Sequence, residues 1–321
     1  MPIISTSTYR PPLLFSNGHI QTLYSTLCRK ITDVAYVRER IETPDSDFID
    51  LDWSETGGGN YAVLVHGMEG HSRRKYMLGM AQAFNRRGWS TVSMNLRGCS
   101  GEPNRYPRSY HSGKTDDLDL AIQHVHATKP CERIVLIGFS IGGNIVLKYL
   151  GEQGKKIPSY IIGAAAISVP CDLESCARHM ARRSNGLYMK RFLKFFHEKI
   201  REKMERMPGQ IDDKGFKYIT TFKQYDDRYT APHNGFTNAE DYWRKASCKR
   251  YLKNISVPTL CLSAKNDPML PDQCYPIIEA RLSKYLFLEM PESGGHVGFV
   301  GFNPEREYWH ETRVTDFICG A

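Results

Sequence analysis

The chain has 321 residues, and 41% of them are hydrophobic, which is enough apolar material for a buried core. This composition excludes a disordered protein, and no repeat or flexible linker divides the sequence, so we expect one domain over residues 1–321 with an insertion. The formal net charge is +8, but residues 182–206 alone carry nine basic and three acidic side chains, a net of +6. Because most of the excess lies in this one segment, the charge does not indicate a nucleic-acid partner.

Residues 1–12 lack the basic start and the apolar stretch of a signal peptide, so we expect a cytoplasmic protein. The nine cysteines show no C-x-x-C spacing, which is typical of reduced thiols. The longest apolar run, residues 160–169, is too short to cross a membrane and is typical of a buried strand.

The predicted elements start with two strands, residues 34–41 and 48–53, joined by a Pro-Asp-Ser-Asp turn that favours an antiparallel hairpin. Strands and helices then alternate, which indicates an α/β fold with a mostly parallel sheet and helices on both faces. Gly151 is expected to end the helix that follows the fifth strand. The further strands are expected at residues 61–65, 90–95, 134–139, 160–169, 259–264 and 285–290, and the helices at residues 72–86, 114–127, 144–150 and 306–318.

The alternation breaks in residues 173–252, which we call the cap. Apolar residues recur there at helical spacing between lysines and arginines, which predicts a long amphipathic helix. We expect the cap to be helical and to cover the C-terminal edge of the sheet. A basic amphipathic helix can also lie on a membrane surface, and contact between the cap and a membrane stays an open alternative. The apolar positions are Tyr188, Phe192, Phe196, Ile200, Met204 and Met207.

The segment Gly-Phe-Ser-Ile-Gly at residues 138–142 lies between a predicted strand and a predicted helix. A serine at such an elbow takes a strained backbone conformation, and glycines two residues before and after it let the strand and the helix approach. Gly138 and Gly142 meet this requirement, so Ser140 is the candidate nucleophile. The backbone N–H of Ile141, at the N-terminus of the helix, is a candidate oxyanion donor.

A serine nucleophile needs a neighbouring base, and the base needs an acid that orients it. Asp267 follows one predicted strand and His296 lies on a glycine-rich loop after the next, so both are expected at the same sheet edge as Ser140. The chain order Ser, Asp, His is that of α/β-hydrolases. We therefore predict Ser140 as nucleophile, His296 as general base and then acid, and Asp267 as the orienting carboxylate.

The loop after the strand at residues 61–65 is the candidate for the second oxyanion donor. Gly67 lets the backbone turn inward, so that the N–H of Met68 can face a reacting carbonyl. His66, at the end of the strand, is expected to hold this loop by hydrogen bonding rather than to act as a second base.

Other polar residues fit a catalytic or metal-binding role less well. Asp226 and Asp227 are alternative acids, but they lie in the cap rather than after a strand. His124 and His126 are two apart on a predicted helix and therefore point in different directions. The sequence contains no H-E-x-x-H motif, no Cys/His cluster and no Walker or G-x-G-x-x-G loop after a strand, so we expect no metal and no cofactor.

Motifs over nearly the whole chain form a family pattern, at residues 17–22, 66–70, 95–104, 138–144, 225–231, 266–268 and 294–299. They resemble the YheT-like subgroup of the α/β-hydrolases, which includes bacterial esterases, fungal medium-chain ester synthase/esterases and mammalian abhydrolase lipases. The resemblance implies the α/β-hydrolase fold, a relay of Ser140, Asp267 and His296, hydrolysis of carboxylic esters and no cofactor. We interpret residues 19–22 as packing near the site, because no chemistry requires them.

The sequence thus predicts a serine esterase that acts on small-molecule esters with short to medium acyl chains. Phe139, Met68 and the aromatic residues of the cap suit an apolar acyl chain. Acyl transfer to an alcohol, or lipase or phospholipase activity, would use the same three residues. A non-catalytic ligand-binding protein on this scaffold is a further alternative, which the complete set of three residues disfavours. The oligomeric state stays open.

Overall fold

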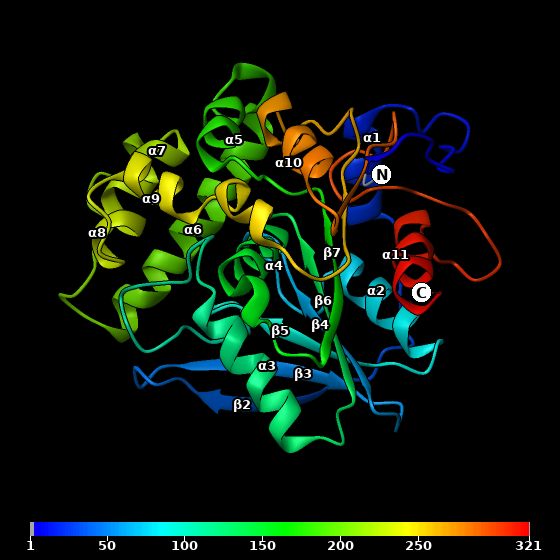
Figure 1. Ribbon diagram of the computed structural model, residues 1–321. Coiled ribbons are helices and arrows are strands. Elements are labelled where there is room, and N and C mark those ends of the chain that lie inside the picture. The colour runs from blue at the N-terminus through cyan, green and yellow to red at the C-terminus, as the bar shows by residue number, and fades with distance from the viewer. Residues whose placement is uncertain (1–2, 321) are drawn as a thin grey trace.

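The computed structural model describes residues 3–320 (Figure 1). Within this range nine strands form one sheet in the order β1-β9-β8-β7-β6-β4-β5-β3-β2. Neighbouring strands are parallel, except that β2 and β5 both run antiparallel to β3. This mostly parallel sheet confirms the predicted α/β fold. The strands are β1 (Ile3–Ile4), β2 (Val37–Glu42), β3 (Phe48–Ser54), β4 (Asn60–Val65), β5 (Ser90–Asn95), β6 (Arg133–Phe139), β7 (Ile161–Ile167), β8 (Thr259–Leu262) and β9 (Leu286–Glu289).

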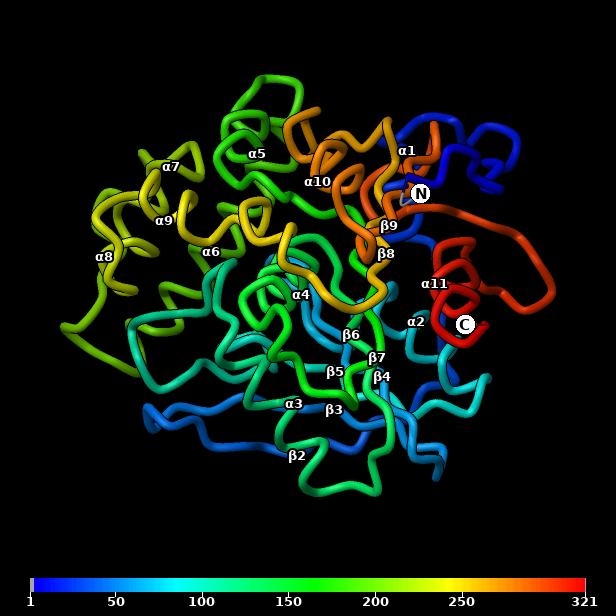
Figure 2. Tube along the Cα trace, viewed as in Figure 1, coloured from blue at the N-terminus to red at the C-terminus, as the bar shows by residue number. Residues whose placement is uncertain are grey.

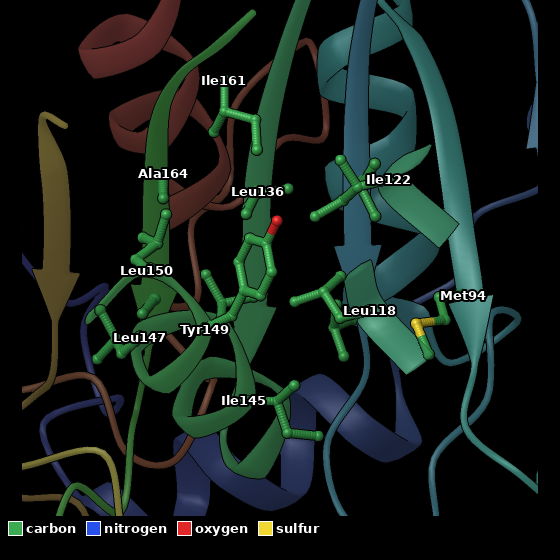
Figure 3. Close-up of a cluster of buried hydrophobic side chains, with 14 of the residues drawn as sticks. Met94, Leu118, Ile122, Leu136, Ile145, Leu147, Tyr149, Leu150, Ile161 and Ala164 are labelled. Atoms are coloured by element: carbon green, nitrogen blue, oxygen red, sulfur yellow. The ribbon is translucent and has the colours of Figure 1, made fainter. Parts of the chain in front are cut away.

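Helices cover both faces of the sheet. On one face lie α3 (Asp116–Thr128) and α4 (Ile141–Gln153), where Leu118 and Ile145 pack with Leu136 of β6 (Figure 3). On the other face lie α2 (Lys75–Asn85) and α11 (Trp309–Cys319), whose buried side chains form a second core cluster. The sheet is therefore buried on both sides, as its apolar strands require.

The cap contains α5 (Leu173–Met180), α6 (Gly186–Arg206), α7 (Phe222–Tyr225), α8 (Ala231–His233) and α9 (Ala239–Ala246). The predicted long amphipathic helix is present as α6. Its Phe196 stacks on Tyr225, with 4.2 Å between ring centroids, inside a hydrophobic cluster of the cap. Met269, which follows β8, belongs to the same cluster, so the cap packs on the sheet edge where β8 ends.

The structure corrects the predicted end of the helix after Ser140. Gly151 does not end α4, which continues to Gln153 and is followed by Gly154 with a positive φ of 52°. Gly151 instead lies against another segment, because a Cβ atom there would be 2.4 Å from the carbonyl oxygen of Tyr251. This glycine therefore lets α4 pack closely against the backbone at Tyr251.

Outside the cap, two helices were absent from the sequence-based prediction, α1 (Gly18–Leu27) and α10 (Ile277–Leu282). The side chain of Asn17 caps α1 by accepting from the N–H groups of His19 and Ile20. Figure 2 shows this early part of the chain beside β8 and β9, and β1 pairs with β9 at the sheet edge. Among residues 3–320, no helix combines the length and the apolar character needed to cross a membrane.

Candidate active site

Ser140 lies at the turn between β6 and α4 and has the strained backbone angles φ 53° and ψ −121°. Two close approaches maintain this turn. A Cβ atom on Gly138 would be 2.4 Å from the carbonyl oxygen of Gly142, and one on Gly142 would be 2.3 Å from that of Val65. Since neither position leaves room for a side chain, packing of the strand against the helix holds the serine in its strained conformation.

The structure brings the three predicted residues together. His296 Nε2 lies 3.0 Å from Ser140 Oγ, and His296 Nδ1 lies 2.8 Å from Asp267 Oδ2. The carboxylate of Asp267 is fully buried, and its other oxygen accepts from the N–H of Met269 at 2.9 Å. Because a carboxylate only accepts, Nδ1 carries a proton and Nε2 is free to take the proton of the Ser140 hydroxyl.

Two polar contacts fix the backbone of the loop that carries His296. The N–H of His296 donates to the Thr22 hydroxyl at 2.8 Å, and the N–H of Gly295 donates to Asn266 Oδ1 at 3.0 Å. Thr22 lies on α1, so the N-terminal part of the chain positions the candidate base. Sequence reasoning assigned residues 19–22 to packing and missed this contact. The family motif was the one signal that could have suggested it.

The loop after β4 runs beside the serine. A Cβ atom on Gly67 would lie 3.2 Å from Ser140 Cβ, and the N–H of Gly67 donates to the Tyr76 hydroxyl. The next N–H, that of Met68, has no hydrogen-bond acceptor within residues 3–320, and the same is true of Ile141 at the N-terminus of α4. Both N–H groups are therefore available to an oxyanion.

His66 holds this loop by hydrogen bonding, as the sequence predicted. Its Nδ1 lies 2.7 Å from the carbonyl oxygen of Gly67, and its Nε2 lies 3.1 Å from the N–H of Leu96. Burial lowers the pKa of His66 to about 3. The imidazole is therefore neutral, with Nδ1 donating and Nε2 accepting.

Glu69 connects the same loop to the cap. It has a positive φ of 51°, and its carboxylate forms an ion pair with Lys199 of α6 at 2.8 Å. Tyr110 accepts from the N–H of Glu69 and donates to its carboxylate. Burial would lower the pKa of Lys199, but the Cys99 sulfur and the Glu69 carboxylate raise it above its usual value. A buried charged pair thus links the cap to the residue after Met68.

A cavity of about 280 Å³ lies over Ser140. Its apolar part includes the two residues expected to face an acyl chain, Phe139 and Met68, and side chains from α6. Five arginine and lysine residues also line it, and one of them, Arg29, forms a buried ion pair with Glu311. The lining includes Leu23, Thr26, Met68, Arg73, Arg74, Lys75, Tyr76, Phe139, Ser140, Tyr188, Arg191, Phe192, Phe195, Met269 and His296.

The alternative residues lie elsewhere. Asp226 accepts from Thr230 and from the Trp243 indole inside the cap, and burial raises its pKa to about 7. Asp227 pairs with Lys223 at 2.7 Å. All nine cysteines are free, and within residues 3–320 no group of three His, Cys, Asp or Glu side chains could hold a metal ion.

Comparisons with known proteins show the family of the chain. Residues 63–301 match the family model described as alpha/beta hydrolase fold. The chain is 34% identical to YheT of Escherichia coli over 98% of this chain and 94% of that protein. It is 31% identical to the phospholipase ABHD3 of Mus musculus over 93% of this chain and 74% of that protein.

A human monoacylglycerol lipase, ABHD2, is 26% identical over 98% of this chain and 81% of that protein. Among solved structures, the esterase Pf2001 of Pyrococcus furiosus is similar with a TM-score of 0.61 and 16% identity, and the match covers 98% of each chain. The chain is therefore a hydrolase of the α/β-hydrolase family, and within that family it belongs with YheT.

Proposed function

We propose that the protein is a serine carboxylic ester hydrolase that acts through Ser140, His296 and Asp267. The observation that carries this proposal is the continuous hydrogen-bonded chain from Asp267 through His296 to a serine at a strained elbow. Relatives that are named as a phospholipase and a monoacylglycerol lipase support ester chemistry. We further propose one domain over residues 1–321, with the cap as its insertion.

In the first half of the reaction, Ser140 Oγ attacks the acyl carbon while its proton moves to His296 Nε2. The carbonyl oxygen becomes an oxyanion, which the N–H groups of Met68 and Ile141 stabilise. The bond from the acyl carbon to the alcohol oxygen then breaks, and His296 returns the proton to the departing alcohol. The result is an acyl group on Ser140 and a free alcohol.

In the second half, His296 Nε2 takes a proton from a water molecule whose oxygen attacks the acyl carbon. The bond to Ser140 breaks, the serine regains the proton, and the carboxylic acid leaves. Asp267 stays ionised throughout and stabilises the imidazolium that forms twice in each cycle.

The apolar lining of the cavity favours a short to medium acyl chain over a charged or sugar-like group. The two lipid-cleaving relatives favour lipid esters as a second candidate substrate class. A panel of p-nitrophenyl esters from acetate to palmitate tests this choice, because a maximum at four to ten carbons is expected and a flat profile would contradict it.

The proposal is tested by Ser140→Ala, assayed with p-nitrophenyl butyrate. We expect kcat to fall by a factor of about 10⁴ or more, with the thermal melting temperature unchanged. Ser184→Ala, at an exposed position in the cap, is the matched control and is expected to keep full activity. Wild-type turnover by Ser140→Ala would overturn the proposal.

A further inference from the structure

Helix α1 has its polar and apolar faces reversed. Its buried residues are Gly18, Gln21, Thr22 and Ser25, whereas Ile20, Leu23 and Leu27 are exposed. The exposed residues recur at positions i, i+3 and i+7 and therefore form one stripe along the helix. A helix on the surface of a soluble protein usually turns such a stripe toward the core.

The polar face points inward because the site uses it. Thr22 accepts from the N–H of His296, and Gln21 accepts from the Tyr9 hydroxyl and from the N–H of Val300. These contacts fix the rotation of α1 about its axis. The apolar stripe is left facing outward, with Leu27 64% exposed.

The stripe continues onto neighbouring segments. Leu13 and Leu14 are 90% and 80% exposed, and the chain next to them is anchored by Phe15, which packs on Tyr24 of α1 at 4.8 Å between ring centroids. Leu187, 86% exposed, precedes Tyr188, whose hydroxyl bonds His19 at 3.0 Å. We call Leu13, Leu14, Ile20, Leu23, Leu27 and Leu187 the apolar rim.

The apolar rim is a concentration of hydrophobic surface. It contains six of the twelve large hydrophobic side chains that are exposed within residues 3–320, and four of the six come from residues 14–27. Large exposed apolar patches on soluble proteins mark sites of contact with other proteins, membranes or ligands. The rim therefore indicates a surface that something apolar covers.

The rim adjoins the mouth of the cavity over Ser140. Leu23 belongs both to the rim and to the cavity lining. Beside it, the Lys75 ammonium donates to the carbonyl oxygen of Leu27 at 2.9 Å. The opening of the cavity is thus next to the exposed apolar stripe.

Basic side chains surround the same opening. Arg73, Arg74, Lys75 and Arg191 line the cavity, and none of them forms an ion pair in the part of the chain that the structure describes. The guanidinium carbon of Arg74, which precedes α2, lies 6.0 Å from the ring centroid of Phe195. The guanidinium carbon of Arg191, in the cap, lies 5.4 Å from the same centroid. Unpaired positive charge therefore lies on both sides of the mouth.

We propose that the apolar rim and these four basic residues dock the protein on an anionic lipid surface, with the cavity open toward that surface. The leucine and isoleucine side chains would enter the boundary between headgroups and acyl chains, and the basic side chains would meet lipid phosphates. An ester held in the lipid phase would then reach Ser140 without crossing water. This inference rests on the proposed function for its substrate, but not for the docking itself.

Co-sedimentation with vesicles tests the docking without any reaction. Wild-type protein is expected to bind vesicles of equal parts phosphatidylglycerol and phosphatidylcholine at least tenfold more tightly than vesicles of phosphatidylcholine alone. Equal affinity for the two vesicles, or no affinity for either, would overturn the proposal.

Two sets of variants separate the apolar and the basic contributions. Ile20→Gln/Leu27→Gln, at positions outside the cavity, is expected to weaken binding to the anionic vesicles at least about tenfold. Val37→Gln, at a 73% exposed position on the far sheet edge, is the control and is expected to bind like wild type. Arg191→Gln is expected to weaken binding about fivefold, whereas Arg201→Gln on the same helix is not. Wild-type binding by Ile20→Gln/Leu27→Gln would overturn the proposal.

Two further readouts keep the outcomes apart. Ile20→Gln/Leu27→Gln is expected to hydrolyse monomeric p-nitrophenyl butyrate at the wild-type rate. If the wild-type protein hydrolyses this ester but does not bind vesicles, the docking proposal is wrong and the proposed function still holds. Sedimentation velocity without lipid tests whether a second copy of the chain covers the rim instead. A dimer that dissociates in Ile20→Gln/Leu27→Gln would overturn the proposal.

Discussion

Ser140 and His296 lie 3.0 Å apart, but the protein holds them by different means. The serine is held by backbone packing between β6, α4 and β4, where no side chain fits at Gly142. The histidine is held by polar contacts, to Asp267 and to Thr22 of a remote helix. Changes to the glycine packing around the serine should therefore cost stability, and changes to the polar contacts of the histidine should cost activity while the fold survives.

The largest effect is expected on the histidine side. Asp267→Asn removes the carboxylate that fixes the tautomer of His296, so kcat for p-nitrophenyl butyrate should fall about 10⁴-fold. Because the side chain keeps its size, the urea midpoint should stay close to that of wild type. A loss of folding without a loss of activity per folded molecule would show that Asp267 acts on stability rather than on the base.

The ion pair between Glu69 and Lys199 connects the loop after β4 to the cap. Its loss should therefore affect both stability and activity. Lys199→Met leaves a buried carboxylate unpaired, which is expected to cost about 3–5 kcal/mol in the free energy of unfolding and to lower kcat through the Met68 loop. Glu69→Gln/Lys199→Met should recover most of the stability in urea denaturation. Lys194→Met, on the exposed side of the same helix, is the control.

On the serine side, Gly142→Ala places a Cβ atom 2.3 Å and 2.5 Å from the carbonyl oxygens of Val65 and His66. Backbone atoms cannot move as a side chain can, so we expect a loss of about 3 kcal/mol in the free energy of unfolding. Gly186→Ala, at a helical glycine whose Cβ atom would meet nothing within 4 Å, controls for the change of residue type. Unchanged stability of Gly142→Ala would contradict the packing account.

A smaller effect is expected from Thr22→Val, which removes the acceptor for the N–H of His296 while keeping the side-chain shape. The loss of this hydrogen bond should destabilise the position of His296 by about 1 kcal/mol. We therefore expect a roughly fivefold lower kcat with KM nearly unchanged. Thr26→Val, which also loses a hydroxyl on α1 but has no contact with His296, is the comparison variant. Equal kinetics for the two variants would show that α1 does not position the base.

An effect that depends on pH is expected from His310, which packs edge-on against Phe139 with 6.3 Å between ring centroids. Burial lowers its pKa to about 3, whereas an unfolded histidine titrates near about 6.5. The unfolded chain therefore takes up the proton first, so this contribution to stability is full above pH 6.5 and is lost as the pH falls toward 3. The expected slope is at most about 1.4 kcal/mol per pH unit.

His310→Leu should remove that slope in urea titrations between pH 6 and pH 4.5, while His66 keeps its own. Both ring nitrogens of His310 lack a hydrogen-bond partner among residues 3–320, so the variant should be no less stable than wild type at pH 8. An unchanged acid slope would contradict the assignment.

The sequence allowed most of the sheet and the region around Ser140 to be predicted, because Gly138, Ser140 and Gly142 are neighbours and apolar strands are distinct. Asp267 and His296 could be predicted because each follows a strand. Helix α1 could not, because its apolar residues face outward and its buried residues are glycine and polar side chains. Glu69 and Lys199 are 130 residues apart, so no local pattern connects them.

Covalent labelling with a fluorophosphonate tests whether Ser140 is a nucleophile that His296 activates. We expect one adduct per chain by intact mass, mapped by peptide sequencing to Ser140. The adduct should be absent in Ser140→Ala and form at least about 10³-fold more slowly in His296→Ala. Failure of the wild-type protein to react, or an adduct on a different residue, would contradict this role of Ser140.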